Sequence, residues 1–95
     1  MRRASKADAN QEDIVKGLRA TGCFVQSIHR LGQGVSDLLV GYRGKWFVME
    51  LKDGAKAVNK QKLTEDEIRW IMEIRNRAPV YVVTSLERAI RIVRE

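Results

Sequence analysis

Asp37, Glu50 and Lys52 are the residues of this sequence whose types and spacing are best suited to chemistry. The apolar runs beside them flank a turn at Arg43-Gly44, and this pattern predicts a β-hairpin. With that turn, Asp37 opposes Glu50 on the neighbouring strand, where like charges repel unless a cation lies between them. Lys52 shares a face with Glu50 because side chains alternate along a strand. The pattern therefore predicts a charged site that holds a divalent cation.

The chemistry expected of such a site is phosphodiester hydrolysis. Carboxylate and carbonyl oxygens are the hard ligands that Mg²⁺ or Mn²⁺ prefers, so Asp37, Glu50 and the backbone carbonyl of Leu51 are the expected metal ligands. The ion would neutralise charge at phosphorus and lower the pKa of a bound water. Lys52 is expected to orient the attacking water or to stabilise the developing negative charge. A structural alternative is that Glu50 and Lys52 only pair at a sheet edge, which contributes ~0–1 kcal/mol.

The chain also resembles a known family in three segments. They are residues 34–39 (Gly-Val-Ser-Asp-Leu-Leu), residues 47–52 (Phe-Val-Met-Glu-Leu-Lys) and the helix that Leu63-Thr64 opens, with Trp70 in it. These segments resemble the VRR-NUC domain of the PD-(D/E)XK nuclease superfamily, of the stand-alone type found in phages and bacteria. The similarity extends from about residue 12 to the C-terminus, although a Ser precedes the Asp where the family usually has Pro.

The resemblance implies a metal-dependent, structure-specific DNA endonuclease, with Mg²⁺ or Mn²⁺ as its cofactor. It further implies a Holliday-junction resolvase-like homodimer that cuts branched DNA, and a restriction-endonuclease-like core. Two other functions stay open, a nicking or flap-type repair nuclease with the same core and a non-catalytic basic nucleic-acid-binding module. In the family, an acidic residue on the first helix helps to build the metal centre, and Glu12 matches it. A Gln on the active-site rim is matched by Glu67.

Simpler explanations exist for both of these glutamates. Glu12 also suits the first turn of a helix, where an acidic side chain complements the helix dipole. Glu67 follows Thr64 by three residues, which is the spacing of a capping box. We favour the metal role for Glu12 and the cap for Glu67.

Composition points to nucleic acid as the partner. The 95 residues carry a net charge of +6 and have a pI near 9.9, which favours a polyanion. The expected DNA contacts are Lys56, Lys60 and Lys62 in a surface loop, and Arg30. His29, the sole histidine, is expected to be structural or DNA-facing and not a general base.

Length and the remaining composition exclude several classes of protein. One small domain spanning residues 1–95 is expected, with residues 1–7 disordered, and burial at this size is marginal enough for dimerisation to help. The single cysteine, Cys23, excludes an internal disulfide and a CxxC zinc site. No apolar run reaches membrane-spanning length and no signal peptide is recognisable. We expect a protein without a membrane partner, in the reducing cytoplasm of a bacterial or phage-infected cell.

Periodicity predicts the elements that must position the site. The fold class is α/β, a small mixed β-sheet flanked by helices in the order α-β-β-β-α-β-α. The predicted elements are a helix that begins at Asp8 or Asn10 and stops at Gly22, a strand at 24–30, the two strands of a hairpin within residues 34–52 and a strand at 79–84. Helices are predicted after Thr64 and after Thr84 or Ser85. Both faces of the hairpin are apolar apart from the site, so both are expected to be covered.

Finer details follow from spacing within these elements. Phe24 and Ile28 are expected to share one face of the first strand. The helix after Thr64 is expected to carry i,i+4 ion pairs, which are Glu65 with Arg69 and Glu73 with Arg77.

Overall fold

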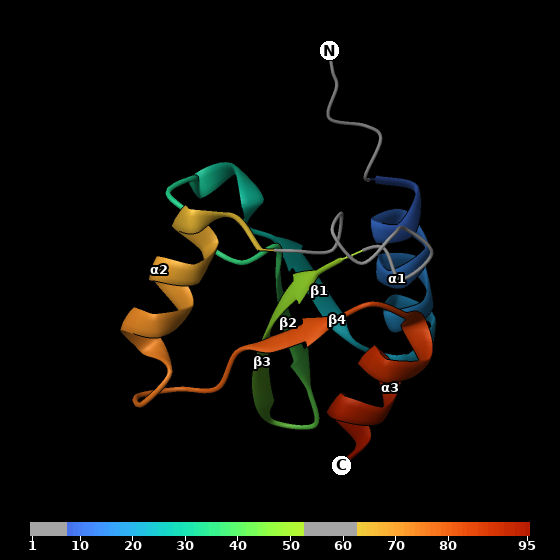
Figure 1. The fold of residues 1–95 in the computed structure, drawn as a ribbon. Coiled ribbons are helices and arrows are strands. Elements are labelled where there is room, and N and C mark those ends of the chain that lie inside the picture. The colour runs from blue at the N-terminus through green and yellow to red at the C-terminus, as the bar shows by residue number, and fades with distance from the viewer. Residues whose placement is uncertain (1–7, 53–62) are drawn as a thin grey trace.

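The computed structural model describes residues 8–52 and 63–95, and these form a small mixed α/β fold (Figure 1). The predicted class, a mixed sheet flanked by helices, is therefore confirmed. Along the chain the elements are α1 (Asp8–Thr21), β1 (Phe24–Ser27), the short 3₁₀ helix η2 (His29–Leu31), β2 (Leu38–Tyr42), β3 (Lys45–Leu51), α2 (Glu65–Ile74), β4 (Tyr81–Val83) and α3 (Leu86–Arg94). The predicted disorder of residues 1–7 and the predicted DNA contacts of Lys56, Lys60 and Lys62 fall outside the described residues.

The four strands form one sheet in the order β1-β2-β3-β4. Strand β2 is antiparallel to both β1 and β3, and β4 is parallel to β3. The hairpin register is the predicted one, with Trp46 opposite Gly41. Its turn residues, Arg43 and Gly44, both have positive φ, 51° and 83°. Such a turn matches the twist of the flanking strands and so fixes the register.

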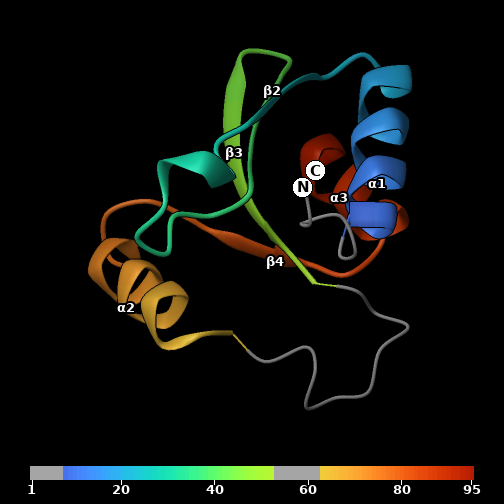
Figure 2. The ribbon, with the colours of Figure 1, turned by 90° about the horizontal axis from the view of Figure 1, so that it is seen from above.

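Helices α1 and α3 lie together on one side of the sheet, and α2 lies on the other side (Figure 2). Gly17 of α1 allows their close approach, because a Cβ at that position would overlap the side chain of Leu86. The core between these two helices and the sheet contains Ile14, Leu18, Cys23, Val25, Leu38, Val40, Phe47, Met49, Leu51, Val83, Ala89, Ile92 and Val93. Cys23 is thus a small core residue.

Within the described part of the chain the other face of the sheet is covered only in part, which differs from the prediction that both faces are covered. No residue of α2 is buried, and Ile68 and Met72 on this helix are 47% and 56% exposed. On the strands, Trp46 and Phe24 are 63% and 56% exposed. A single helix of ten residues is too small to cover four strands.

The first strand is shorter than predicted, and its buried residue is Val25. It ends at Ser27, because the chain turns into η2 from His29 onward. Val25 is the core residue of β1, whereas Phe24 faces outward. Simple alternation predicted the strand but could not choose its buried face.

The caps of the later helices are as predicted, but the ion pairs on α2 are not. Thr64 caps α2 and Ser85 caps α3. Arg69 pairs with Asp66 at 2.9 Å and not with Glu65. The Arg77 guanidinium donates to the backbone oxygen of Glu73 and not to its carboxylate. Exposed ion pairs contribute little free energy, so such side chains can pair with any of several nearby groups at nearly equal free energy. None of the helices in the described part of the chain is long and apolar enough to cross a membrane.

Candidate functional site

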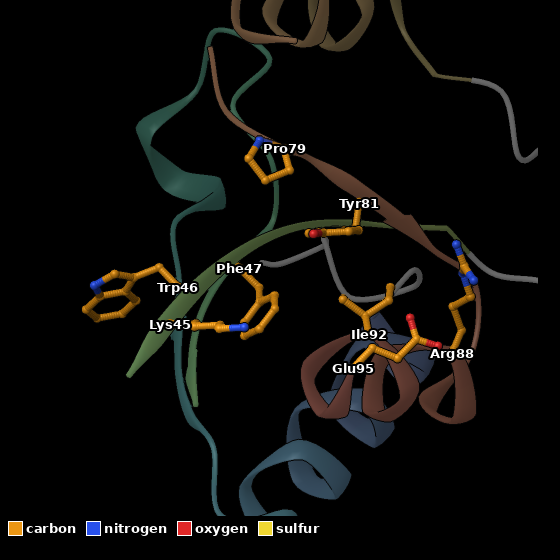
Figure 3. Close-up of a pocket in the computed structure, with 8 residues that line it drawn as sticks. All are labelled: Lys45, Trp46, Phe47, Pro79, Tyr81, Arg88, Ile92 and Glu95. Carbon is orange, nitrogen blue, oxygen red and sulfur yellow. The ribbon is translucent and has the colours of Figure 1, made fainter. Parts of the chain in front are cut away.

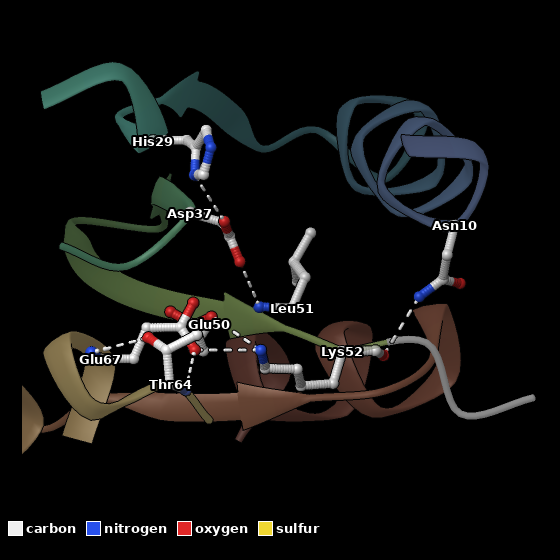
Figure 4. Close-up of polar contacts among 8 residues, drawn as sticks. All are labelled: Asn10, His29, Asp37, Glu50, Leu51, Lys52, Thr64 and Glu67. Carbon is white, nitrogen blue, oxygen red and sulfur yellow. Dashed lines mark hydrogen bonds and ion pairs between the residues drawn. The ribbon is translucent and has the colours of Figure 1, made fainter. Parts of the chain in front are cut away.

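The carboxyl end of β3 brings the predicted site residues together (Figure 4). Glu50 is the penultimate residue of this strand and Lys52 follows its last residue. The strand is held on both edges here, since the N–H of Lys52 donates to the oxygen of Val83 at 2.9 Å. Asn10 of α1 donates from its side chain to the backbone oxygen of Lys52 at 3.2 Å. The backbone of the site is therefore fixed by β4 and α1.

Asp37 lies just before β2 and is committed to two contacts. Its Oδ2 accepts the N–H of Leu51 at 2.7 Å, and its Oδ1 lies 3.3 Å from Nδ1 of His29. The β2–β3 ladder ends at Leu38 and Met49, and the N–H of Asp37 donates to the oxygen of Met49. The strict pairing of Asp37 with Glu50 that the sequence suggested is therefore absent. The carboxylate of Asp37 has instead taken the N–H that a continued ladder would use.

This contact also orients the backbone of Leu51. The N–H and C=O of one residue in an extended strand project toward the same neighbour. The carbonyl oxygen of Leu51 therefore projects toward the edge from which Asp37 approaches. This orientation is compatible with the predicted role of that carbonyl as a metal ligand.

Glu50 is the most deeply buried charged residue of the described chain, with 1% exposure. Burial, together with the nearby charge of Asp37 and a hydrogen bond to Glu67, raises its pKa to about 9. Its Oε1 has no hydrogen-bond partner among the described residues. Protonated, the carboxyl group donates to Glu67. Without a cation the neutral form is favoured, because an isolated buried charge is costly.

Lys52 lies between two carboxylates. Its Nζ is 3.0 Å from Oε1 of Glu67 and 3.7 Å from Oε2 of Glu50. The same Glu67 oxygen accepts the N–H of Thr64 at 2.9 Å, and the hydroxyl of Thr64 accepts the N–H of Glu67 at 3.1 Å. The predicted capping box is confirmed. Glu67 also faces the site, so the two interpretations offered for it coexist.

Opposing influences set the pKa values of the other two acids. Burial raises the pKa of Asp37, and the Leu51 N–H and the charge of His29 oppose this only in part. For Glu67, burial acts to raise the pKa, but hydrogen bonds from Thr64, Glu50 and Lys52 outweigh it and the pKa is lowered. Glu67 is thus the acid that stays ionised most easily.

The acids present fit a magnesium-type ion better than a metal held by protein ligands alone. Among the residues described, no group of three or more His, Cys, Asp or Glu side chains is arranged to hold a metal. Mg²⁺ commonly uses one or two carboxylates and completes its shell with water and substrate phosphate. Glu50 contributes a buried oxygen without a partner, and Asp37 contributes a second carboxylate. These residues could hold such an ion.

The other predicted site residues lie further from this network. Glu12 is exposed on α1, and it is Asn10 that makes the contact from this helix to Lys52. Arg30 is exposed on η2, next to His29. Sequence reasoning missed the contacts of His29 and Asn10. Only the uniqueness of the histidine gave a signal, since nothing in a sequence pairs it with Asp37.

Three hollows on the described surface have linings that include none of these acids. One of about 500 Å³ is lined by Lys45, Trp46, Phe47, Pro79, Tyr81, Arg88, Ile92 and Glu95 (Figure 3). It contains none of the predicted site residues. Comparison of the chain with models of protein families, with curated protein sequences and with solved structures found no match.

Proposed function

We propose that this protein is a metal-dependent DNA endonuclease with a PD-(D/E)XK core of the VRR-NUC type. It would act as a homodimer on branched DNA, in a bacterial or phage-infected cell. The single observation that carries the proposal is the state of Glu50. Its carboxyl group is buried near a second acid and has an unpartnered oxygen, with an amine at 3.7 Å. Perturbed acids of this kind cluster at functional sites.

Each residue has a separate task in this proposal. Asp37, Glu50 and the Leu51 carbonyl would hold Mg²⁺ or Mn²⁺, which when bound supplies Lewis-acid stabilisation of the phosphate and an acidified water. His29 holds the Asp37 carboxylate in place from the side remote from Leu51. Lys52 presents a positive charge where the phosphate would develop negative charge. Thr64 fixes Glu67, and Glu67 fixes the amine of Lys52.

A second candidate is a basic nucleic-acid-binding module that does not cut. One observation favours it: Lys52 is already engaged by Glu67 at 3.0 Å. An amine that is neutralised by its own chain has less charge to offer a phosphate. The two candidates make opposite predictions about divalent-dependent cleavage.

The decisive experiment incubates the protein with duplex, nicked, flap and four-way DNA in Mg²⁺, in Mn²⁺ or in chelator. We expect divalent-dependent cutting, strongest on the four-way substrate. Glu50→Gln and Lys52→Ala should each reduce cutting by about 10²-fold or more. Binding of the same DNA in chelator should change little. Glu73→Gln and Lys16→Ala, which alter exposed residues on α2 and α1, serve as matched controls.

Two results would remove the enzymatic assignment. One is undiminished cutting by either site variant, and the other is no cutting of any substrate with either metal. The homodimer has its own test, because a two-fold dimer places two cutting centres on a symmetric junction. A monomer in sedimentation, with and without four-way DNA, would contradict the dimer.

A further inference from the structure

The tip of the β2–β3 hairpin has a surface that the site does not explain. A hollow of about 350 Å³ is lined by Gly22, Phe24, Gly41, Tyr42, Arg43, Gly44, Lys45 and Trp46. We propose that this hollow binds an unpaired nucleobase of a DNA strand, stacked on Trp46, with the adjoining phosphates on Arg43 and Lys45. The inference rests on the proposed function and refines its substrate to DNA with unpaired bases beside the duplex that is cut.

Trp46 is held as a platform with one face free. A Cβ on Gly41 would lie 3.2 Å from Cζ3 of the indole, so the ring rests against the bare backbone of this glycine. The edge of Phe24 meets the ring in a T-shaped contact, with centroids 6.1 Å apart. The indole is nevertheless 63% exposed. A fixed, exposed aromatic ring is the element on which proteins stack bases of any sequence.

The positive charges that line the hollow beside Trp46 favour a partner that is both anionic and aromatic. Its lining includes Arg43 and Lys45 but no carboxylate. The guanidinium carbon of Arg43 lies 5.1 Å from the centroid of the Tyr42 ring, which orients this cation. Lys45 also lines the hollow of Figure 3, where Arg88 adds a cation and Glu95 an acid. Trp46 lines both hollows, and each of them therefore includes cationic side chains.

A nucleotide matches this lining better than a second copy of the chain does. An interface between copies is normally depleted of charge at its centre, whereas two cations line this small hollow. A nucleotide combines a flat ring with a negative charge and so complements both the indole and the cations. Binding of single strands in general relies on this combination of stacking and a basic groove.

The distance from Trp46 to the candidate site indicates where the unpaired base would lie on the substrate. Trp46 and Glu50 project from the same face of β3, four residues apart, which is roughly 13 Å along a strand. That distance spans about four steps of a DNA duplex. The unpaired base would therefore lie about four nucleotides from the scissile phosphate.

The test measures the fluorescence of Trp46 during titration with oligothymidylate in chelator, where no cutting occurs. Trp70→Phe leaves Trp46 as the sole tryptophan, since the chain has two. We expect saturable quenching by the single strand and little change with a blunt duplex closed by loops at both ends. Trp46→Ala should weaken oligothymidylate binding by about 5- to 150-fold, and Trp46→Phe should restore most of it. Arg43→Ala should weaken binding and reduce its salt dependence.

Matched controls alter exposed groups elsewhere. Leu31→Ala removes a side chain that is 73% exposed on η2, and Arg75→Ala removes an exposed cation just after α2. Neither should change oligothymidylate binding. Because Trp46 is exposed, the Trp46 variants should keep the melting temperature of the parent, and circular dichroism checks this.

Three results would overturn the inference. These are the absence of saturable quenching, equal quenching by closed duplex, and self-association in sedimentation that Trp46→Ala abolishes. The last would assign the face to a second copy. Failure of the nuclease assignment is distinguishable, because stacking measured in chelator does not depend on cutting. Stacking without any cleavage would support this inference and contradict the nuclease assignment. Cleavage, together with unchanged oligothymidylate binding by Trp46→Ala, would support the nuclease assignment and contradict this inference.

Discussion

Lys52 and Glu67 form an ion pair of 3.0 Å that connects the end of β3 to the first turn of α2. Both side chains are partly buried, with 15% and 18% exposure. Since Glu67 is also half of the capping box, the start of the helix and the amine of the site depend on the same carboxylate. Helix α2 therefore contributes to the site although none of its residues is buried.

Glu67→Gln should separate these two roles. Glutamine can keep the capping box, but it removes a negative charge from Lys52 and from Glu50. We expect the pKa of Glu50 to fall from about 9, because the hydrogen bond and the charge of Glu67 both raise it. Carbon-13 NMR titration of the Glu50 carboxyl measures this change.

A matched variant tests the cap alone. Thr64→Ala should lower the free energy of unfolding by about 1 kcal/mol and leave the Glu50 pKa high, since the backbone N–H of Thr64 still holds Glu67. An unchanged Glu50 pKa in Glu67→Gln would show that the two carboxyl groups do not interact.

The stability of the metal-free protein should decrease as pH rises, and Glu50 is the main cause. Its pKa is about 9 in the folded chain against an ordinary value of 4.5. The folded chain therefore holds this proton more tightly than the unfolded chain. The resulting stability is complete below about pH 4.5 and is lost as pH rises through about 9, at ~1.4 kcal/mol per unit. The raised pKa of Asp37 acts in the same direction.

Urea unfolding at pH 5, 7 and 9 in chelator measures this loss. Glu50→Gln should make the free energy of unfolding less dependent on pH. At pH 9 the variant should be more stable than the parent by about a few kcal/mol, on the order of the stability that the parent loses as Glu50 deprotonates. Mg²⁺ should restore stability to the parent at high pH and not to the variant. Parallel profiles for parent and variant would contradict the assignment to Glu50.

Gly34→Ala should disturb the site from a distance. Gly34 has φ +82°, and a Cβ there would overlap the backbone oxygen of Asp66 in the first turn of α2. We expect a loss of more than about 1 kcal/mol in unfolding free energy and reduced cutting, because Glu67 moves with that turn. Gly32→Ala is the control, since Gly32 also has positive φ, +73°, but a Cβ there would contact nothing within 4 Å. Equal losses in the two variants would mean that only backbone strain matters.

Ser36→Ala should be tolerated. The hydroxyl of Ser36 is buried and has no hydrogen-bond partner among the described residues. Removing an unpaired buried polar group should leave stability unchanged or raise it by up to about 1 kcal/mol. Ser85→Ala, which removes the cap of α3, should instead cost about 1 kcal/mol. A large loss in thermal unfolding of Ser36→Ala would indicate that a water or ligand satisfies this hydroxyl.

Local patterns in the sequence predicted the features that depend on residues close together in the chain. The Arg43-Gly44 turn fixed the hairpin register, and the Thr64 to Glu67 spacing gave the cap. Contacts between distant segments were beyond such reasoning. His29 contacts Asp37 only because β1 ends at Ser27 and the chain continues into η2. Asn10 contacts Lys52 only because α1 packs beside the end of β3.

Strand β4 pairs with β3 only from Met49 to Leu51. The described part of the chain thus supports the carboxyl half of β3 on two edges and its amino half on one. Amide hydrogens near Glu50 should therefore exchange with solvent more slowly than those near Trp46, because more backbone hydrogen bonds must open to release them.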